Sequence, residues 1–165
     1  MRGDNIPLIT NHNAMERTAT MKIVSPVVGE LDVASDRIIN FPAGMPGFEN
    51  CQRFTLLHME SAAPRLFLLQ SLDDLDVAFT VTTPDFLGLN YEFPLSDDEV
   101  NTLQLERSED VSVLLIMRRN DEAANNEAPV SANLMAPLVL NTHARRGLQK
   151  VIGRVDTEVT LRAVA

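Results

Sequence analysis

Residues 131–141 read SANLMAPLVLN, and residues 142–152 continue as THARRGLQKVI. Two apolar runs are separated by a polar loop that ends in glycine, a pattern typical of buried strands joined in a hairpin. Asn133 and Asn141 bracket Pro137, which cannot donate a hydrogen bond to a β-ladder. We expect both amide side chains to cap or tie backbone groups near strand ends, with contact to a partner protein as the alternative.

Segments of strand length recur along the rest of the chain, either mostly apolar or with alternating polar and apolar residues. They comprise residues 22–26, 29–33, 37–41, 54–59, 66–70, 78–82, 111–117 and 155–162. One helix is predicted to begin after Ser96, because Glu99 completes a capping box, and to end near Leu103. Many short strands with a single helix do not suit a doubly wound sheet. The sequence therefore predicts a mostly β fold, a small antiparallel β-barrel-like domain with one or two short helices.

The length of 165 residues and the hydrophobic share of 45% indicate one domain with a substantial core. Residues 1–20 are polar and lack the pattern of a secretion signal, so we expect a disordered N-terminal extension before a single domain at residues 21–165. No apolar run approaches the roughly 18 residues of a membrane span. The single cysteine, Cys51, suits a reducing compartment, and we expect a cytoplasmic protein.

The net charge of −9 is unevenly distributed along the chain. Residues 60–110 contain twelve acidic residues and two arginines, a balance of −10, so the rest of the chain sums to +1. This acidic middle argues against direct binding of nucleic acid, because contacts to phosphate need lysine and arginine. It permits a basic protein as partner, although solubility alone would also explain it.

Residues that could carry chemistry form no recognisable catalytic or metal-binding motif. No serine lies in a Gly-x-Ser-x-Gly elbow, and Cys51 has no neighbours that suggest activation. Asp73, Asp74 and Asp76 lack the glycine and the terminal glutamate of a calcium loop, so a solvated turn is the preferred interpretation. We expect no cofactor, no metal and no enzymatic activity. A hydrolase whose partner residues lie far apart in sequence stays an alternative.

Five segments, taken in order, resemble the FliW family of flagellar assembly factors. They are GELDV at 29–33, INFPAGMPGFE at 39–49, LQSL at 69–72, NYE at 90–92, and NLMAPLVLN at 133–141 with GLQKVI at 147–152. The resemblance covers residues 21 to about 152. The departures are mild: methionine replaces the usual leucine at Met45, serine replaces threonine at Ser131, and asparagine replaces the common aspartate at Asn90.

The resemblance implies a non-enzymatic cytoplasmic protein of small β-barrel-like fold, a monomer when free. Members of the family bind flagellin and, in many lineages, the carbon storage regulator CsrA, an RNA-binding translational repressor. The implied mechanism is a partner switch in which accumulating flagellin displaces the repressor. Such a switch requires competing or negatively coupled binding.

The family motifs assign no contact residue, so contact residues are predicted from residue type and position beside loops. They are Phe48, Glu49, Gln70, Phe86 and Tyr91, together with the acidic Asp73, Asp74 and Asp76. For each residue, core packing or plain solvation is the alternative interpretation. A small β-barrel that binds a small molecule is the alternative function, and it would need an apolar pocket with converging polar groups.

Overall fold

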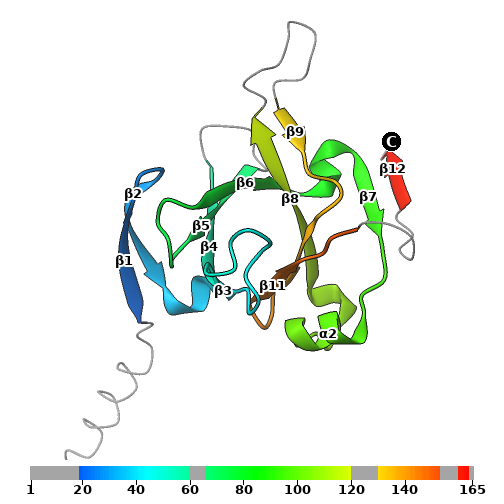
Figure 1. Cartoon of the computed structure of the whole chain (residues 1–165), viewed down its shortest axis with the longest axis horizontal. Coiled ribbons are helices and arrows are strands. Elements are labelled where there is room, and N and C mark those ends of the chain that lie inside the picture. The colour runs from blue at the N-terminus through cyan, green and yellow to red at the C-terminus, as the bar shows by residue number, and fades with distance from the viewer. Residues whose placement is uncertain (1–18, 60–65, 120–129, 153–159, 164–165) are drawn as a thin grey trace, which may run out of the picture.

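The computed structural model describes residues 19–59, 66–119, 130–152 and 160–163 (Figure 1). Its strands are β1 (Thr20–Ser25), β2 (Gly29–Ala34), β3 (Ile38–Asn40), β4 (Arg53–His58), β5 (Leu66–Ser71), β6 (Ala78–Thr82), β7 (Leu89–Glu92), β8 (Val111–Arg119), β9 (Val130–Ala132), β10 (Leu138–Asn141), β11 (Arg146–Gln149) and β12 (Thr160–Ala163). One α-helix, α2 (Asp97–Leu103), and three short 3-10 helices, η1 (Ser35–Arg37), η2 (Pro84–Leu87) and η3 (Ser108–Asp110), complete these ranges. The expected extension at 1–20 and the expected strand at 155–162 fall largely outside the described residues.

Seven strands close into a ring in the order β10, β11, β3, β4, β5, β6 and β8, because β8 also pairs with β10. Neighbouring strands of the ring are antiparallel except β11 and β3, which are parallel and meet at Arg146 and Asn40. The prediction of a mostly β, barrel-like fold is confirmed. The expectation of an antiparallel barrel holds for every pair in the ring except this one.

The strand expected over residues 131–141 is interrupted in the structure. β9 pairs with the end of β8 at Ala132 and Met117, and β10 pairs with its start at Leu138 and Leu114. Five residues, 133–137, therefore lie beside only two residues of β8. Pro137 contributes to the break, since it has no N–H to donate to the β-ladder. The predicted hairpin is confirmed as the pair β10 and β11.

Side chains fill the interior of the barrel. The main core cluster contains Ile39, Phe41, Met45, Cys51, Phe54, Leu69, Val81, Leu114, Leu138 and Leu140, all buried. The rings of Phe41 and Phe54 meet edge to face, with 5.1 Å between centroids. The barrel thus encloses a packed core, as expected for a small number of strands.

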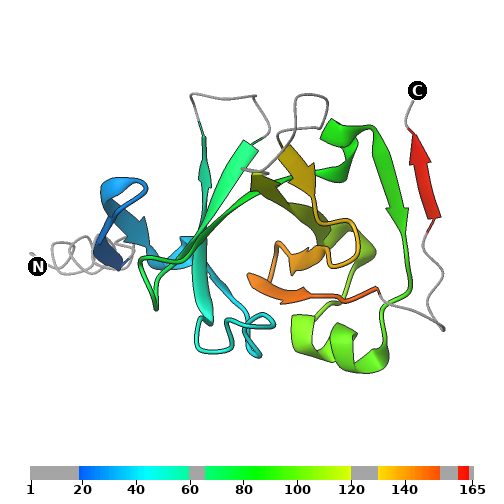
Figure 2. The same ribbon diagram turned by 45° about the horizontal axis from the view of Figure 1, so that its top comes forward.

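Two smaller sheets flank the barrel on opposite sides (Figures 1 and 2). The β1–β2 hairpin packs through a second apolar cluster, in which Ile23 and Val33 meet Leu72 of the barrel. On the other side β12 pairs with β7. None of the helices in the described ranges has both the length and the apolar character needed to cross a membrane.

Helix α2 follows its local sequence signals in part. The hydroxyl of Ser96 accepts a hydrogen bond from the backbone N–H of Glu99 at 3.2 Å, as a capping box requires. The Glu99 carboxylate does not complete the box. It accepts from Lys150 Nζ at 2.8 Å, and only 10% of the Lys150 side chain is exposed. The helix is thereby tied to the chain that follows β11.

Candidate functional site

The barrel wall opens between β6 and β8. The two strands pair only at Val81 with Ile116 and at Thr82 with Leu115, so residues 78–80 of β6 are not paired to β8. A cavity of about 440 Å³ lies at this opening. We call it the β6–β8 groove and define it by Met45, Phe48, Phe79, Ile116, Met117 and Arg118.

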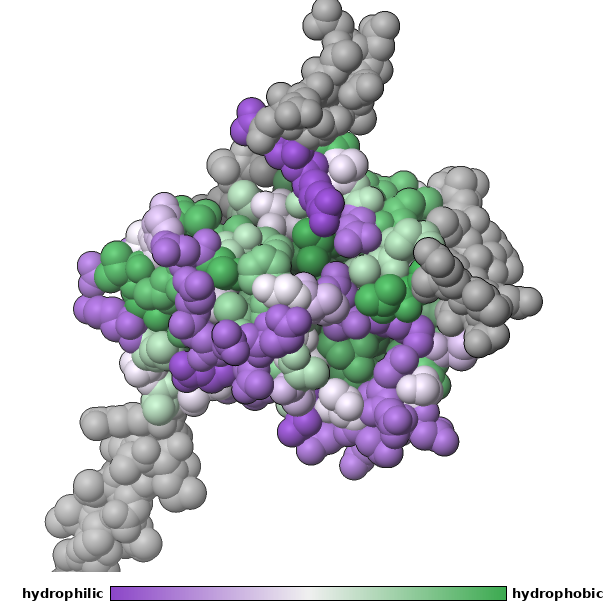
Figure 3. Space-filling model, in the orientation of Figure 1, coloured by the Kyte–Doolittle hydropathy of each residue, from purple (hydrophilic) through white to green (hydrophobic). Residues whose placement is uncertain are grey.

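The floor of the β6–β8 groove is continuous with the barrel core. Met45 belongs to the main core cluster, and Phe79 and Ile116 pack against that cluster. Phe48 covers one side of the groove, with its ring edge to face against Phe79 at 5.1 Å and 39% of the residue exposed. On the face seen in Figure 3, hydrophobic patches in the middle of the molecule are interspersed with hydrophilic surface, which also lines the lower edge. The core therefore reaches solvent at the groove instead of ending beneath a closed wall.

A tightly bonded loop holds Phe48 in place. Gly44 donates its N–H to Phe41 O at 2.8 Å, and Phe48 donates to Met45 O at 2.7 Å. Phe48 O in turn accepts from the N–H of Cys51 at 3.0 Å. These bonds fold residues 42–49, PAGMPGFE, back on themselves. A hydrogen-bonded turn therefore fixes the position of the Phe48 ring.

Arg118 is the charged residue of the groove. It is exposed, and it also borders two adjoining hollows, one along Ser131–Met135 and one beside Leu66 and Val130. Within the described part of the chain its side chain forms no hydrogen bond or ion pair, while its backbone belongs to the β8–β9 ladder. On a protein of net charge −9, this places an unpaired cation beside exposed apolar surface.

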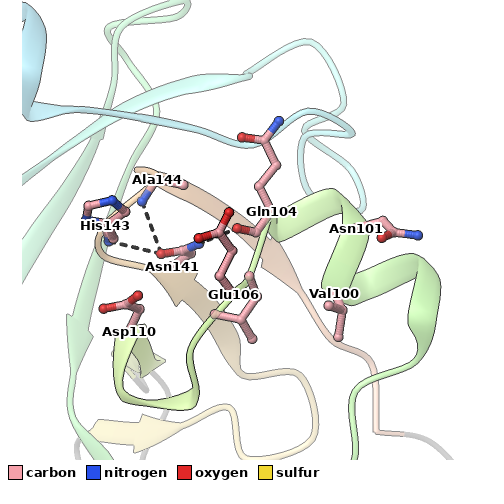
Figure 4. Close-up of a pocket in the computed structure, with 9 residues that line it drawn as sticks. Val100, Asn101, Gln104, Glu106, Asp110, Asn141, His143 and Ala144 are labelled. Atoms are coloured by element: carbon pink, nitrogen blue, oxygen red, sulfur yellow. Dashed lines mark hydrogen bonds between the residues drawn. The ribbon is translucent and has the colours of Figure 1, made fainter.

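A second hollow, of about 590 Å³, lies at the end of α2 and contains Glu106, Asp110 and His143 (Figure 4). Asn141 lies at its centre. Asn141 Nδ2 donates to Leu103 O at 2.9 Å and to Gln104 O at 3.1 Å. Its Oδ1 accepts from the backbone N–H groups of the following turn, at 3.0 and 3.1 Å. The structural interpretation of Asn141 is thus confirmed, since its amide joins the helix end to the β10–β11 turn.

Neither hollow contains a metal-binding cluster among the residues that the structure describes. No group of three or more His, Cys, Asp or Glu side chains could hold a metal ion within the ranges described. Cys51 is buried in the core cluster, which keeps its thiol away from any substrate.

Residues 22–163 match the family model described as FliW protein. The chain belongs to the FliW family. The flagellar assembly factor FliW of Azoarcus sp. strain BH72 is 52% identical over 143 residues, which cover 86% of this chain and 98% of that protein. The factor of the same name from Chromobacterium violaceum is 39% identical over 141 residues, covering 82% and 96%. A crystal structure of the flagellar assembly factor FliW superposes with a TM-score of 0.70 at 28% identity, covering 87% of this chain and 96% of that one.

The predicted contact residues of this FliW-family chain do not gather at one place. Phe48 lines the groove, and the neighbouring Glu49 is exposed, with Oε1 accepting from Gly47 N at 3.1 Å. Phe86, on η2, is 39% exposed. Tyr91, on β7, is half-buried, which raises the pKa of its hydroxyl, and it donates to Leu134 O at 2.5 Å. Their part in binding stays a prediction.

Gln70 is not on the surface, so the expectation that it is exposed to a partner is wrong. It is 0% exposed. Its Oε1 accepts from Ser25 Oγ at 2.8 Å, and its Nε2 donates to Ser71 O, Leu75 O and Val77 O at 2.9, 3.1 and 3.3 Å. The amide joins the β1–β2 hairpin to the turn between β5 and β6, because a buried polar group needs its hydrogen bonds inside the protein.

The acidic turn after β5 contains the carboxylate of Asp73, which is paired with an arginine, and two exposed carboxylates, of which Asp74 Oδ1 accepts from the N–H of Asp76 at 3.1 Å. Asp73 Oδ2 accepts from Gln52 N and Arg53 N, both at 2.8 Å, and Oδ1 binds the Arg53 guanidinium at 2.8 Å. Burial alone would raise the pKa of Asp73, but these hydrogen bonds and the arginine charge outweigh it and lower the pKa below its ordinary 3.8. Asp74 and Asp76 are exposed. They remain candidates for contact with a partner.

Replacing Asp73 by asparagine should lower the free energy of unfolding at pH 7 by about 1–2 kcal/mol, because hydrogen bonds to a charged carboxylate are lost. Since the pKa of Asp73 is lowered in the folded state, its contribution is present above pH 3.8 and is lost as the pH falls through the folded pKa. Urea unfolding at several pH values tests this. The control Asp76→Asn should change stability by less than about 0.5 kcal/mol, as Asp76 is exposed. A loss of stability for Asp73→Asn that persists below the folded pKa would contradict the assignment.

Sequence reasoning missed Arg118 as a groove residue. The one available signal was its place directly after the apolar run at 111–117, where a cation follows a strand in a strongly acidic chain. The remaining groove residues lie in three separate segments, so nothing local brings them together.

Proposed function

We propose that this protein is a non-enzymatic cytoplasmic flagellar assembly factor, a monomer when free, that binds flagellin and the translational repressor CsrA. The observation that carries the proposal is the 52% identity to a flagellar assembly factor over 98% of that protein's length. The match to the family model runs over residues 22–163, a range that includes the barrel and both flanking sheets.

In this proposal the factor links flagellin synthesis to flagellar assembly by switching partners. While flagellin is scarce, the factor holds the repressor. Flagellin that accumulates takes its place, and the released repressor silences flagellin synthesis. Each partner must weaken the binding of the other by the same factor, since coupling between two binding equilibria is reciprocal.

The alternative of a barrel that binds a small molecule has less support. Such a site inside the barrel would need an empty apolar interior with converging polar groups. Phe41, Phe54 and Leu69 fill that space and are 0% exposed. The opening that does exist, the β6–β8 groove, lies in the wall and suits a peptide better than an enclosed ligand.

A pull-down from flagellated cells tests the proposed function directly. The tagged protein should recover flagellin from cells that overproduce it and the repressor from cells that lack flagellin. Adding purified flagellin to the second complex should release the repressor. Recovery of neither protein would overturn the proposal, and simultaneous, independent binding of both would overturn the partner switch.

Two exposed acids in the turn after β5, Asp74 and Asp76, provide a testable contact for a basic RNA-binding repressor. We expect the double variant Asp74→Lys, Asp76→Lys to bind CsrA roughly tenfold more weakly at low salt, because surface charges attract across an interface and salt screens them. Titration calorimetry at two salt concentrations measures the effect.

A matched control changes the same number of charges elsewhere. Glu106 and Glu109 are exposed near α2, and the ion pair of Glu109 with Arg107 is itself exposed. The variant Glu106→Lys, Glu109→Lys should keep the affinity of the wild type to within about threefold. Equal weakening in both double variants would show that net charge, not the turn, determines binding.

A further inference from the structure

We propose that the β6–β8 groove binds an extended segment of flagellin that carries apolar side chains and a carboxylate, and that this segment adds as a strand to the open edge of β6. The inference rests on the proposed function for the identity of the protein that supplies the segment. The geometry of the groove indicates where the segment binds, which conformation it adopts and which side chains it carries.

The extended conformation of the bound segment is inferred from the unpaired edge of β6. β6 is paired along its other edge with β5, where Thr80 lies opposite Leu68 and Ala78 lies opposite Gln70. On the groove side, residues 78–80 have no strand partner within the described ranges, although they are half-buried. Backbone donors and acceptors at such an edge bind an extended chain by continuing the ladder.

The apolar part of the segment follows from the groove floor. Phe48, Phe79 and Met117 line the cavity, and the cavity volume of about 440 Å³ can accept a few side chains of medium size. Covering these residues would remove apolar surface from water, which is favourable in proportion to its area. A flexible methionine and an aromatic ring adapt to different side chains.

The carboxylate of the bound segment is inferred from Arg118. This exposed guanidinium borders the groove and both adjoining hollows, and it has no partner in the part of the chain that the structure describes. A carboxylate beside it would form a charge-assisted, bidentate pair. The same charge disfavours a basic, RNA-binding partner at this place, so the groove suits flagellin better than the repressor.

The principal test measures flagellin binding by titration calorimetry with the full chain. We expect Arg118→Glu to weaken binding about tenfold or more, because reversal of a charge next to a bound carboxylate replaces attraction by repulsion. Arg118→Lys should retain most of the affinity. The matched control is Arg37→Glu, since Arg37 is also exposed but lies on η1, outside the groove. It makes the same charge change.

Two further readouts test the mode of binding. Hydrogen–deuterium exchange at residues 78–80 should slow when flagellin is bound, as expected for amides that enter a ladder. On an array of overlapping flagellin peptides, the wild type should retain segments that combine apolar and acidic residues, and Arg118→Glu should lose them.

The outcomes separate this inference from the proposed function. If the wild type binds flagellin, while Arg118→Glu matches Arg37→Glu in affinity and exchange at residues 78–80 is unchanged, the groove inference is overturned and the proposed function stands. Retention of mainly basic peptides would also overturn it. Failure of the wild type to bind flagellin would overturn both.

Discussion

Replacing Gly44 by alanine should lower the free energy of unfolding by about 3–4 kcal/mol, the sum of a left-handed backbone penalty and a steric overlap. Gly44 has a φ of +67°, a conformation that residues with a Cβ adopt only under strain. A Cβ there would lie 2.6 Å from Glu49 Cα and 2.7 Å from Phe48 O. Both atoms belong to the backbone, so no side chain can rotate away to relieve the overlap.

Gly47 offers a matched control in the same loop. Its φ is +86°, but a Cβ would meet nothing within 4 Å. Gly47→Ala should therefore cost only the backbone penalty, about 1–2 kcal/mol. Urea unfolding of both variants measures the difference. Equal losses in the two variants would contradict this prediction. They would show that the close approach of Gly44 to the Phe48–Glu49 backbone adds nothing to the backbone penalty.

Replacing Asn141 by alanine should lower the free energy of unfolding by about 3 kcal/mol, because it leaves buried backbone groups without hydrogen-bond partners. Four hydrogen bonds disappear, two to the carbonyls that end α2 and two from the turn between β10 and β11. Asn141 is buried, so in the wild type its amide, and not bulk water, satisfies these backbone groups. The amide protons of His143 and Ala144 should also exchange faster in the variant.

Asn133 is the natural comparison, since it is the other asparagine that brackets Pro137. Its backbone N–H donates to Ile116 O at 2.8 Å, but its side chain makes no hydrogen bond within the described ranges, so the expectation that this amide ties backbone groups is wrong. Asn133→Ala should change stability by less than about 1 kcal/mol. Thermal and urea unfolding of Asn141→Ala and Asn133→Ala measure the two losses of stability. Similar losses in the two variants would show that the four bonds of Asn141 contribute little.

Much of the local structure follows from neighbouring residues. Ser96 predicts the start of α2 because the N-cap bond reaches only to Glu99, three residues away. The β10–β11 hairpin is predictable because its two strands are joined by a short polar loop. In both cases the interacting groups are close in sequence, so pattern and propensity suffice.

The position of Gln70 could not be predicted in the same way. Leu68, Leu69, Gln70 and Ser71 are all buried, so β5 has no exposed face and its sequence no period of two. The amide can be buried there because Ser25, 45 residues earlier, supplies one of its partners. The hydrogen bonds of Asp73 could not be predicted either, because its partners are far away in sequence. Arg53 begins the neighbouring strand β4, and Gln52 directly precedes it.

The sequence by itself determined the fold class, the helix, the hairpin and the family, because these depend on local signals and on motifs read in order. Only the tertiary structure decided that β8 closes the ring with β10 and separates from β6 after Ile116. It alone brought Phe48, Phe79 and Arg118 to one groove. The physical reason is that strand pairing and side-chain contacts join residues far apart in the chain, whereas periodicity reports only on near neighbours.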